Sequence, residues 1–258
     1  KITIKDPTIL SKYELARTYN KKQLQQSTDV NRISPRAPDI LFLEQNIKLL
    51  KPGKGKLAIV IPFQIASGPQ TYFIREWLLK NTQILAIVDL PSETFQPYTG
   101  TKTSLLLVKR RPTPLKDVDV SNDPKIFMSV PKWIGHDRRG NPTYKRNVDG
   151  SLSEEILTDF PEIEASFKAF LNGKDASKTY SESFEIPAKN ILLNTDYRID
   201  AQYHKSHSEI GNSFSHSTLN GKWKLMKIKD LVNKIFYPGR FARNYVEHVD
   251  NSVPSLGG

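Results

Sequence analysis

The sequence predicts an α/β fold with a doubly wound sheet. Two segments with helical spacing of apolar residues alternate with continuously apolar segments, a pattern typical of strands covered by helices on both faces. A further apolar segment follows without an intervening helix, which indicates a hairpin at the end of the sheet. The 258 residues are enough to bury a sizeable core, as one large domain or two smaller ones.

The first helix is predicted over Asp39–Leu50, where apolar residues recur at helical spacing. The Lys-Pro-Gly sequence at 51–53 ends this helix, because proline and glycine both disfavour its continuation. Leu57–Ile61 follows and is continuously apolar, as expected for a buried strand. A second helix then opens after Gly68, and its apolar stripe consists of Phe73, Ile74, Trp77 and Leu78.

Two further buried strands are predicted at Ile84–Leu90 and Thr103–Lys109. The connection 91–103 contains two prolines, one glycine and no helical pattern. A parallel pair of strands needs a long crossover, usually a helix, whereas an antiparallel pair can be joined by a loop. We therefore expect all three strands in one sheet, with the last strand antiparallel to the other two.

The second half of the sequence is more polar. Lys125–Val130 is a candidate strand, and Gly135–Tyr144 is a polar turn rich in basic residues. Ser151–Gly173 carries apolar residues, and Pro161 is expected to divide it into two short helices because proline breaks a helix interior. Residues 174–222 are rich in Ser, Asn and Lys.

Composition narrows the possible partners and locations. The formal net charge of +11 favours a polyanionic partner. Nucleic acid is preferred to an anionic membrane surface, because the sequence shows no basic amphipathic helix and no terminal polybasic tract. The absence of cysteine excludes disulfides, thiolate zinc sites and cysteine nucleophiles, and it fits a reducing compartment such as the cytoplasm. We therefore expect a cytoplasmic protein without a membrane partner.

Asp39–Gly53 and Lys56–Pro62 form a predicted helix, a Lys-Pro-Gly turn and a strand. These segments, and several that follow them in the chain, resemble the modification subunits of type I restriction systems, which are adenine-N6 DNA methyltransferases. Asp39–Gly53 and Lys56–Pro62 are similar to the fifth helix–strand unit of the catalytic domain of that family. Together the similar segments cover about half of the chain. In order, they are Asp39–Gly53, Lys56–Pro62, Tyr72–Asn81, Ile84–Pro91, Glu93–Phe95, Gly100–Lys109, Phe127–Val130 and Gly135–Gly140.

The resemblance implies the C-terminal part of a class I methyltransferase (Rossmann-like) sheet that ends in an antiparallel hairpin. A helical bridge and the start of a mixed α+β recognition domain would follow. The expected divisions are 1–146 for the catalytic part, 147–190 for the bridge and 191–258 for the start of the target-recognition domain. The last assignment depends on Asp196–Asp200, Tyr203 and Trp223–Tyr245, which look like the beginning of such a domain.

The chain departs from the family pattern at several points. Lys54 separates two glycines where the family usually has Lys-Pro-Gly-Gly, and Phe63-Gln64 stands where the family tends to have Asp-Gly. Two hallmark elements are absent from this sequence: the glycine-rich turn that holds S-adenosylmethionine, and the Asn-Pro-Pro-(Phe or Tyr) tetrapeptide that grips the flipped adenine. In the family both precede the segment matched by Asp39–Pro62. We therefore assign no catalytic, cofactor-binding or metal-binding residue, and expect S-adenosylmethionine only in a parent protein.

The resemblance places the connection 91–103 where it can touch a flipped base. Methylation of an exocyclic amine requires the base to leave the stack and lie against aromatic faces. Phe95 is the first candidate for stacking and Tyr98 the second, although Phe95 could also be a core plug at a strand end. Lys102 and Thr103 could bind a phosphate or sugar, and the alternative is an ordinary solvated turn.

Two basic clusters are candidate contacts to DNA. Arg138 and Arg139 suit backbone phosphates, and the alternative is a charged, solvated turn. The second cluster combines cations with an aromatic ring beside Pro-Gly, a mixture that suits phosphates and base edges, although it could be a basic loop with packed phenylalanines. This second cluster consists of Lys234, Tyr237, Arg240 and Arg243.

The resemblance and the charge together predict part of an S-adenosylmethionine-dependent DNA adenine-N6 methyltransferase of a restriction–modification system, inactive alone. The expected partners are DNA, a specificity subunit and a restriction subunit. One alternative is a non-catalytic DNA-specificity protein that retains a degenerate methyltransferase scaffold. A second is a related methyltransferase that acts on RNA or protein, which should carry no recognition domain after residue 190.

Overall fold

The computed structural model divides the chain into two compact units, Lys1–Ile210 and Gly211–Gly258. The fold below is that of the first unit, which contains nearly all of the described residues. None of the described helices is long and apolar enough to cross a membrane. The structure describes residues 2–17, 19–20, 25–26, 32–213, 226 and 230–232.

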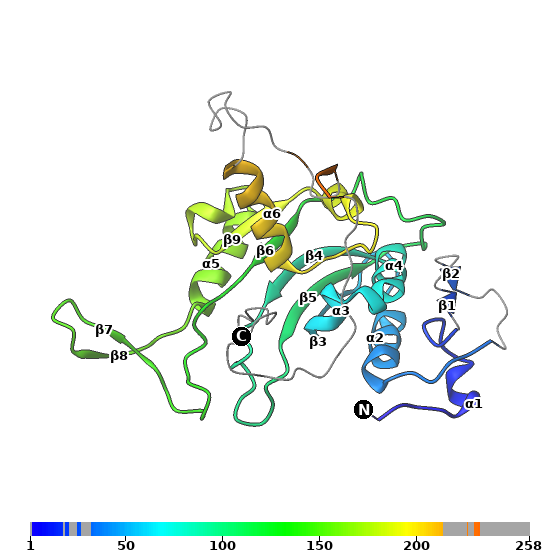
Figure 1. Cartoon of the computed structure of the whole chain (residues 1–258), viewed down its shortest axis with the longest axis horizontal. Coiled ribbons are helices and arrows are strands. Elements are labelled where there is room, and N and C mark those ends of the chain that lie inside the picture. The colour runs from blue at the N-terminus through cyan, green and yellow to red at the C-terminus, as the bar shows by residue number, and fades with distance from the viewer. Residues whose placement is uncertain are drawn as a thin grey trace, which may run out of the picture. The chain divides into compact units, whose positions relative to one another are not determined.

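A mixed five-stranded sheet with the order β3-β5-β4-β6-β9 forms the centre of the first unit (Figure 1). β5 pairs antiparallel with both β3 and β4, β6 runs parallel to β4, and β9 pairs antiparallel with β6. The expectation of three strands in one sheet, with the last antiparallel to the others, is confirmed. The strands are β3 (Lys56–Pro62), β4 (Thr82–Asp89), β5 (Thr103–Arg110), β6 (Ile126–Ser129) and β9 (Ser183–Ile186).

Helices pack against both faces of this sheet. Alternate residues of a strand point to opposite faces, and β5 shows this directly: Leu106 and Val108 join the core with α2 (Pro38–Leu49) and α4 (Tyr72–Asn81), whereas Leu107 joins the core under α5 (Phe160–Leu171). The first two helices lie close to their predicted positions. Burying apolar side chains of this size stabilises the fold by about 1.5–3 kcal/mol each.

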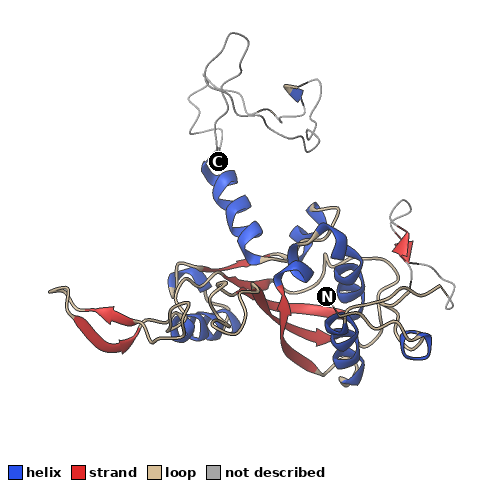
Figure 2. Ribbon diagram, turned by 60° about the horizontal axis from the view of Figure 1, so that its bottom comes forward, coloured by secondary structure: helices blue, strands red, loops and turns tan. Residues whose placement is uncertain are grey.

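The remaining elements are short or lie outside the sheet. β7 and β8 pair antiparallel as a two-stranded hairpin, which projects away from the sheet in both views (Figure 1, Figure 2). The elements are α1 (Pro7–Leu10), α3 (Phe63–Ser67), α6 (Ala201–Ser213), the 3-10 helices η1 (Pro69–Thr71), η2 (Ala176–Lys178) and η3 (Ala188–Leu193), and the strands β1 (Tyr19–Asn20), β2 (Gln25–Gln26), β7 (Tyr144–Arg146) and β8 (Leu152–Ile156).

The expectation of two short helices in Ser151–Gly173 is wrong. Its first part forms β8, in which Leu152 pairs with Arg146 of β7. Pro161 does not interrupt a helix but lies in the first turn of α5. Proline is tolerated there, because its missing N–H would have no intrahelical acceptor and its fixed φ suits a helix start.

The first compact unit extends past residue 190. Residues 147–190, for which a bridge is expected, contain α5 and also β9, which belongs to the central sheet. Beyond these residues, Ile191, Ile199 and Ala201 are fully buried in the main core. The compact unit therefore continues to residue 210.

Two buried charged residues attach the flanking segments to this core. Glu44 of α2 is fully buried, and its carboxylate accepts hydrogen bonds from the backbone N–H groups of Glu14 and Leu15, each at 2.8 Å. Arg75 of α4 is also fully buried, and its guanidinium donates two hydrogen bonds to the carbonyl oxygen of Asp196, at 2.9 and 2.7 Å.

Arg75 has further acceptors that make it a structural anchor. Its Nη1 donates to the carbonyl oxygens of Ile65 and Gly68, both at 2.9 Å. Burial lowers the pKa of Arg75 to about 10, which leaves the guanidinium charged at neutral pH. The side chain therefore joins the end of β3, through α3, to the segment that precedes α6.

We predict that Arg75→Met destabilises the fold by about 3 kcal/mol or more, because it leaves buried carbonyl oxygens without their donor. Urea unfolding monitored by tryptophan fluorescence measures this change. Arg139→Met, a control of the same type at an exposed position, should change stability by less than about 0.5 kcal/mol. Equal effects of the two substitutions would contradict the anchoring role of Arg75.

Candidate nucleic-acid interface

The carboxyl ends of β3 and β4 meet at one edge of the sheet, beside the start of β5. Pro62 at the end of β3 is opposite Thr103, and Asp89 at the end of β4 is opposite Ser104. The 91–102 loop joins β4 to β5 at this edge. Ligands of open α/β sheets bind outside the carboxyl ends of the strands. This edge is therefore the expected position of a functional site.

The 91–102 loop presents two aromatic side chains to solvent. Phe95 is 39% exposed and Tyr98 is 95% exposed, so Phe95 is not a plug of the core. Backbone hydrogen bonds within the loop fix its path, including those from Gln96 N to Glu93 O at 2.9 Å and from Thr99 N to Phe95 O at 3.0 Å. Both aromatic rings are thus available on an ordered loop.

Lys102 and Thr103 differ in accessibility. Thr103 is buried, and its hydroxyl has no hydrogen-bond partner among the described residues. Lys102 is half-buried, with its Nζ 4.1 Å from the centroid of the Phe63 ring and 2.7 Å from Oε1 of Gln202. Of these two predicted residues, only Lys102 presents a polar group at the surface.

The polar turn of residues 135–141 lies against the 91–102 loop. Arg138 Nε donates to Glu93 Oε1 at 3.1 Å. A hydrogen bond from Ser92 and the nearby Arg138 guanidinium together lower the pKa of Glu93. Gly140 is also close: a Cβ atom there would lie 3.1 Å from Pro97 Cδ. The structure therefore brings Arg138 to the loop that carries the two aromatic rings.

Asp137 holds the tip of this turn. Its Oδ1 accepts from the backbone N–H groups of Arg139 and Asn141, at 2.8 and 2.9 Å. Arg139 itself is exposed. The second predicted basic cluster lies outside the described residues and consists of Lys234, Tyr237, Arg240 and Arg243.

Asp89 is a residue of this edge that the sequence reasoning missed. It is 1% exposed, and its carboxylate accepts from Ser104 Oγ at 2.7 Å and from Gln202 N at 2.8 Å. Burial raises the pKa of Asp89 to about 6. The sequence does show a single acidic residue at the end of an otherwise apolar strand. Its partner Gln202, however, is remote in the sequence.

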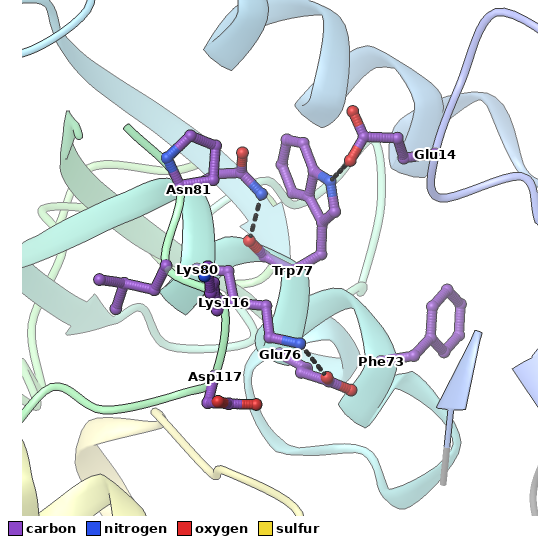
Figure 3. Close-up of a pocket in the computed structure, with 10 residues that line it drawn as sticks. Glu14, Phe73, Glu76, Trp77, Lys80, Asn81, Lys116 and Asp117 are labelled. Atoms are coloured by element: carbon purple, nitrogen blue, oxygen red, sulfur yellow. Dashed lines mark hydrogen bonds and ion pairs between the residues drawn. The ribbon is translucent and has the colours of Figure 1, made fainter. Parts of the chain in front are cut away.

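A separate cavity of about 490 Å³ lies near the end of α4 (Figure 3). Trp77 Nε1 donates to Glu14 Oε2 at 2.9 Å, and Lys80 Nζ donates to Glu76 Oε1 at 2.7 Å. The cavity adjoins the segments before β4 and after β5, so it is not part of the 91–102 edge. Within the described residues, no group of three or more His, Cys, Asp or Glu side chains could hold a metal ion.

The fold is of the α/β class, because helices pack against both faces of a mixed sheet. A loop with aromatic and basic residues lies at the carboxyl ends of two of its strands. Residues 8–148, more than half of the chain, match the family described as N-6 DNA Methylase. The chain therefore belongs to this DNA methyltransferase family. No individual curated protein matches the chain significantly.

Three solved structures that the chain is similar to come from type I restriction–modification systems or enzymes. One, determined to study complex assembly and conformational transition, is 18% identical over 77% of this chain and 40% of its own, with a TM-score of 0.44. A modification subunit of a putative type I restriction enzyme from Vibrio vulnificus YJ016 is 21% identical over 71% and 34%, with a TM-score of 0.40. The EcoKI M protein is 16% identical over 76% and 46%, with a TM-score of 0.42. The chain thus spans less than half the length of each.

The raised pKa of Asp89 predicts an unusual pH dependence of stability. A carboxyl whose pKa rises from 3.8 to about 6 on folding binds its proton more tightly in the folded state. Its contribution to stability therefore increases as pH falls from about 6 to about 4. The stability of the native protein relative to Asp89→Asn should rise by about 1–3 kcal/mol between pH 7 and pH 4.

Urea unfolding of the two proteins across this pH range provides the measurement. Asp119→Asn is the control, because hydrogen bonds from Ser121 lower the pKa of that exposed carboxylate. The corresponding difference for Asp119 should change in the opposite direction. A difference for Asp89→Asn that does not vary with pH would refute the burial argument.

Proposed function

We propose that the chain forms the C-terminal part of the catalytic domain of an S-adenosylmethionine-dependent DNA adenine-N6 methyltransferase from a restriction–modification system. The family match over residues 8–148 carries this proposal. The matched region contains β3, β4 and β5, which would be the last strands of a class I methyltransferase sheet. The antiparallel pairing of β5 supports this placement.

The 91–102 loop would contact the target base. A base that is methylated on its exocyclic amine has to leave the helix stack and lie against aromatic or apolar side chains. Phe95 and Tyr98 offer exposed rings on this loop. Lys102, Arg138 and Arg139 would neutralise neighbouring phosphates, which position DNA without reading its sequence.

The described residues do not fit the binding of S-adenosylmethionine. The family holds this cofactor at a glycine-rich turn after a strand. Here β3 continues directly into Phe63, β4 into Leu90-Pro91 and β6 into Val130-Pro131, so none of these strands leads into a glycine-rich turn. We therefore propose that another part of a parent protein supplies the cofactor site, and that this chain alone is inactive.

DNA and the specificity and restriction subunits of such a system are the proposed partners. The functional divisions are likewise proposals: 1–146 as catalytic, 147–190 as a bridge and 191–258 as the start of target recognition. The missing cofactor turn keeps one alternative open, a non-catalytic DNA-specificity protein built on a degenerate methyltransferase scaffold. A parent sequence without the Asn-Pro-Pro tetrapeptide would favour that alternative.

We predict that isothermal titration calorimetry detects no binding of S-adenosylmethionine to the 258-residue chain at concentrations up to about 100 μM, well above the low end of typical KM values. The reason is the missing glycine-rich turn. Binding with a low-micromolar Kd would show that the chain contains a cofactor site that the sequence and fold do not reveal.

A second prediction concerns DNA. Binding of the chain to a mixed-sequence duplex should weaken steeply with salt, with a log–log slope of about −0.9 for each phosphate neutralised. Arg139→Ala should reduce the magnitude of this slope by about one unit. Lys174→Ala, which removes an exposed cation in the turn after α5, is the control and should leave the slope unchanged. An unaltered slope for Arg139→Ala would remove this residue from the interface.

A further inference from the structure

The first turn of α6 meets the base of the 91–102 loop through two hydrogen bonds. The backbone N–H of Gln202 donates to Asp89 Oδ2 at 2.8 Å, and Lys102 Nζ donates to the side-chain oxygen of Gln202 at 2.7 Å. Gln202 thus connects a buried carboxylate of β4 to a basic residue of the candidate interface. These contacts join segments that lie far apart in the sequence.

The start of α6 suits a carboxylate. The unpaired N–H groups of a helix N-terminus carry a partial positive charge, which favours nearby anions. Asp200 precedes the helix, and its Oδ2 accepts from Tyr203 N at 3.2 Å, while Arg198 holds the same carboxylate with two hydrogen bonds of 2.9 Å. Asp89 supplies a second carboxylate from the sheet, and Ser104 Oγ fixes its other oxygen.

Lys102 is consequently held on two sides. Its ammonium group lies over the Phe63 ring at 4.1 Å and contacts Gln202 Oε1. A lysine that is free in solution loses side-chain entropy when it binds a phosphate, whereas one that is already ordered loses less. The ammonium group keeps a third donor for a ligand, because it has three N–H bonds.

We propose that Asp89 and Gln202 are positioning residues that hold Lys102 in the orientation in which it meets a DNA phosphate beside the 91–102 loop. The inference rests on the proposed function. Asp89 fixes the first turn of α6, Gln202 projects from that turn, and Lys102 follows Gln202. A displacement of the start of α6 therefore changes the position of the cation.

A double-mutant cycle with a mixed-sequence DNA duplex tests this inference. Gln202 is exposed, so Gln202→Ala should fold normally and weaken DNA binding by about two- to fivefold, the range for a solvent-accessible polar contact. Lys102→Ala should weaken it at least as much. If Gln202 acts through Lys102, the double variant should bind as Lys102→Ala does, because the effects are not additive. Fluorescence anisotropy measures all four affinities.

Asp89→Asn provides a second test, since it alters the contact that fixes the first turn of α6. Its effect on DNA binding should also disappear in the Lys102→Ala background. Gln45→Ala, which truncates an exposed glutamine on α2, is the matched control and should leave affinity unchanged. Circular dichroism shows whether each variant is folded, and Gln202→Ala decides the question if Asp89→Asn is not.

The outcomes separate this inference from the proposed function. Additive effects of Gln202→Ala and Lys102→Ala would overturn the positioning role while leaving the interface intact. Tighter DNA binding by Gln202→Ala would also overturn it, because Gln202 would then sequester the cation. Wild-type affinity of Lys102→Ala would instead remove Lys102 from the interface, and with it both proposals for this residue.

Discussion

The hydrogen bonding of β5 to both β3 and β4 is the constraint on which the candidate interface depends. Because β5 runs antiparallel between two strands of the same direction, its first residue lies beside the carboxyl end of each. Phe63 after β3, Asp89 at the end of β4 and Lys102 before β5 therefore converge at one edge.

Buried charges, rather than apolar area alone, specify how the flanking segments attach to this sheet. Glu44 holds the backbone of residues 14–15, Arg75 holds Asp196, and Asp89 holds the first turn of α6. Each of these charged groups is at most 1% exposed. An unsatisfied group in such a place is costly, so each contact restricts the partner segment to few arrangements. The polar sequences of these flanking segments can therefore pack against an apolar core.

Local sequence pattern was sufficient for the part of the fold with strong periodicity. The helices α2 and α4 and the strands β3, β4 and β5 were predictable, because continuous apolar runs and helical spacing are properties of neighbouring residues. β8 and β9 were missed because charged and polar residues interrupt their apolar pattern, as in Leu-Ser-Glu-Glu-Ile and Ser-Phe-Glu-Ile. Pro161 was misjudged because proline both starts and breaks helices. At the candidate interface, the position of the 91–102 loop indicated Phe95 and Tyr98 as candidate base contacts. The contacts Asp89–Gln202 and Arg138–Glu93 could not be predicted, because they join residues that are far apart in the sequence.

The projecting β7–β8 hairpin has a different relation to the rest of the molecule. Its residues Tyr144, Leu152 and Ile156 are exposed, and its strands pair only with each other among the described elements. A lone two-stranded hairpin is marginally stable in water. Cooperative unfolding requires shared buried contacts, which the hairpin largely lacks. It can therefore open as a small unit while the central sheet stays folded.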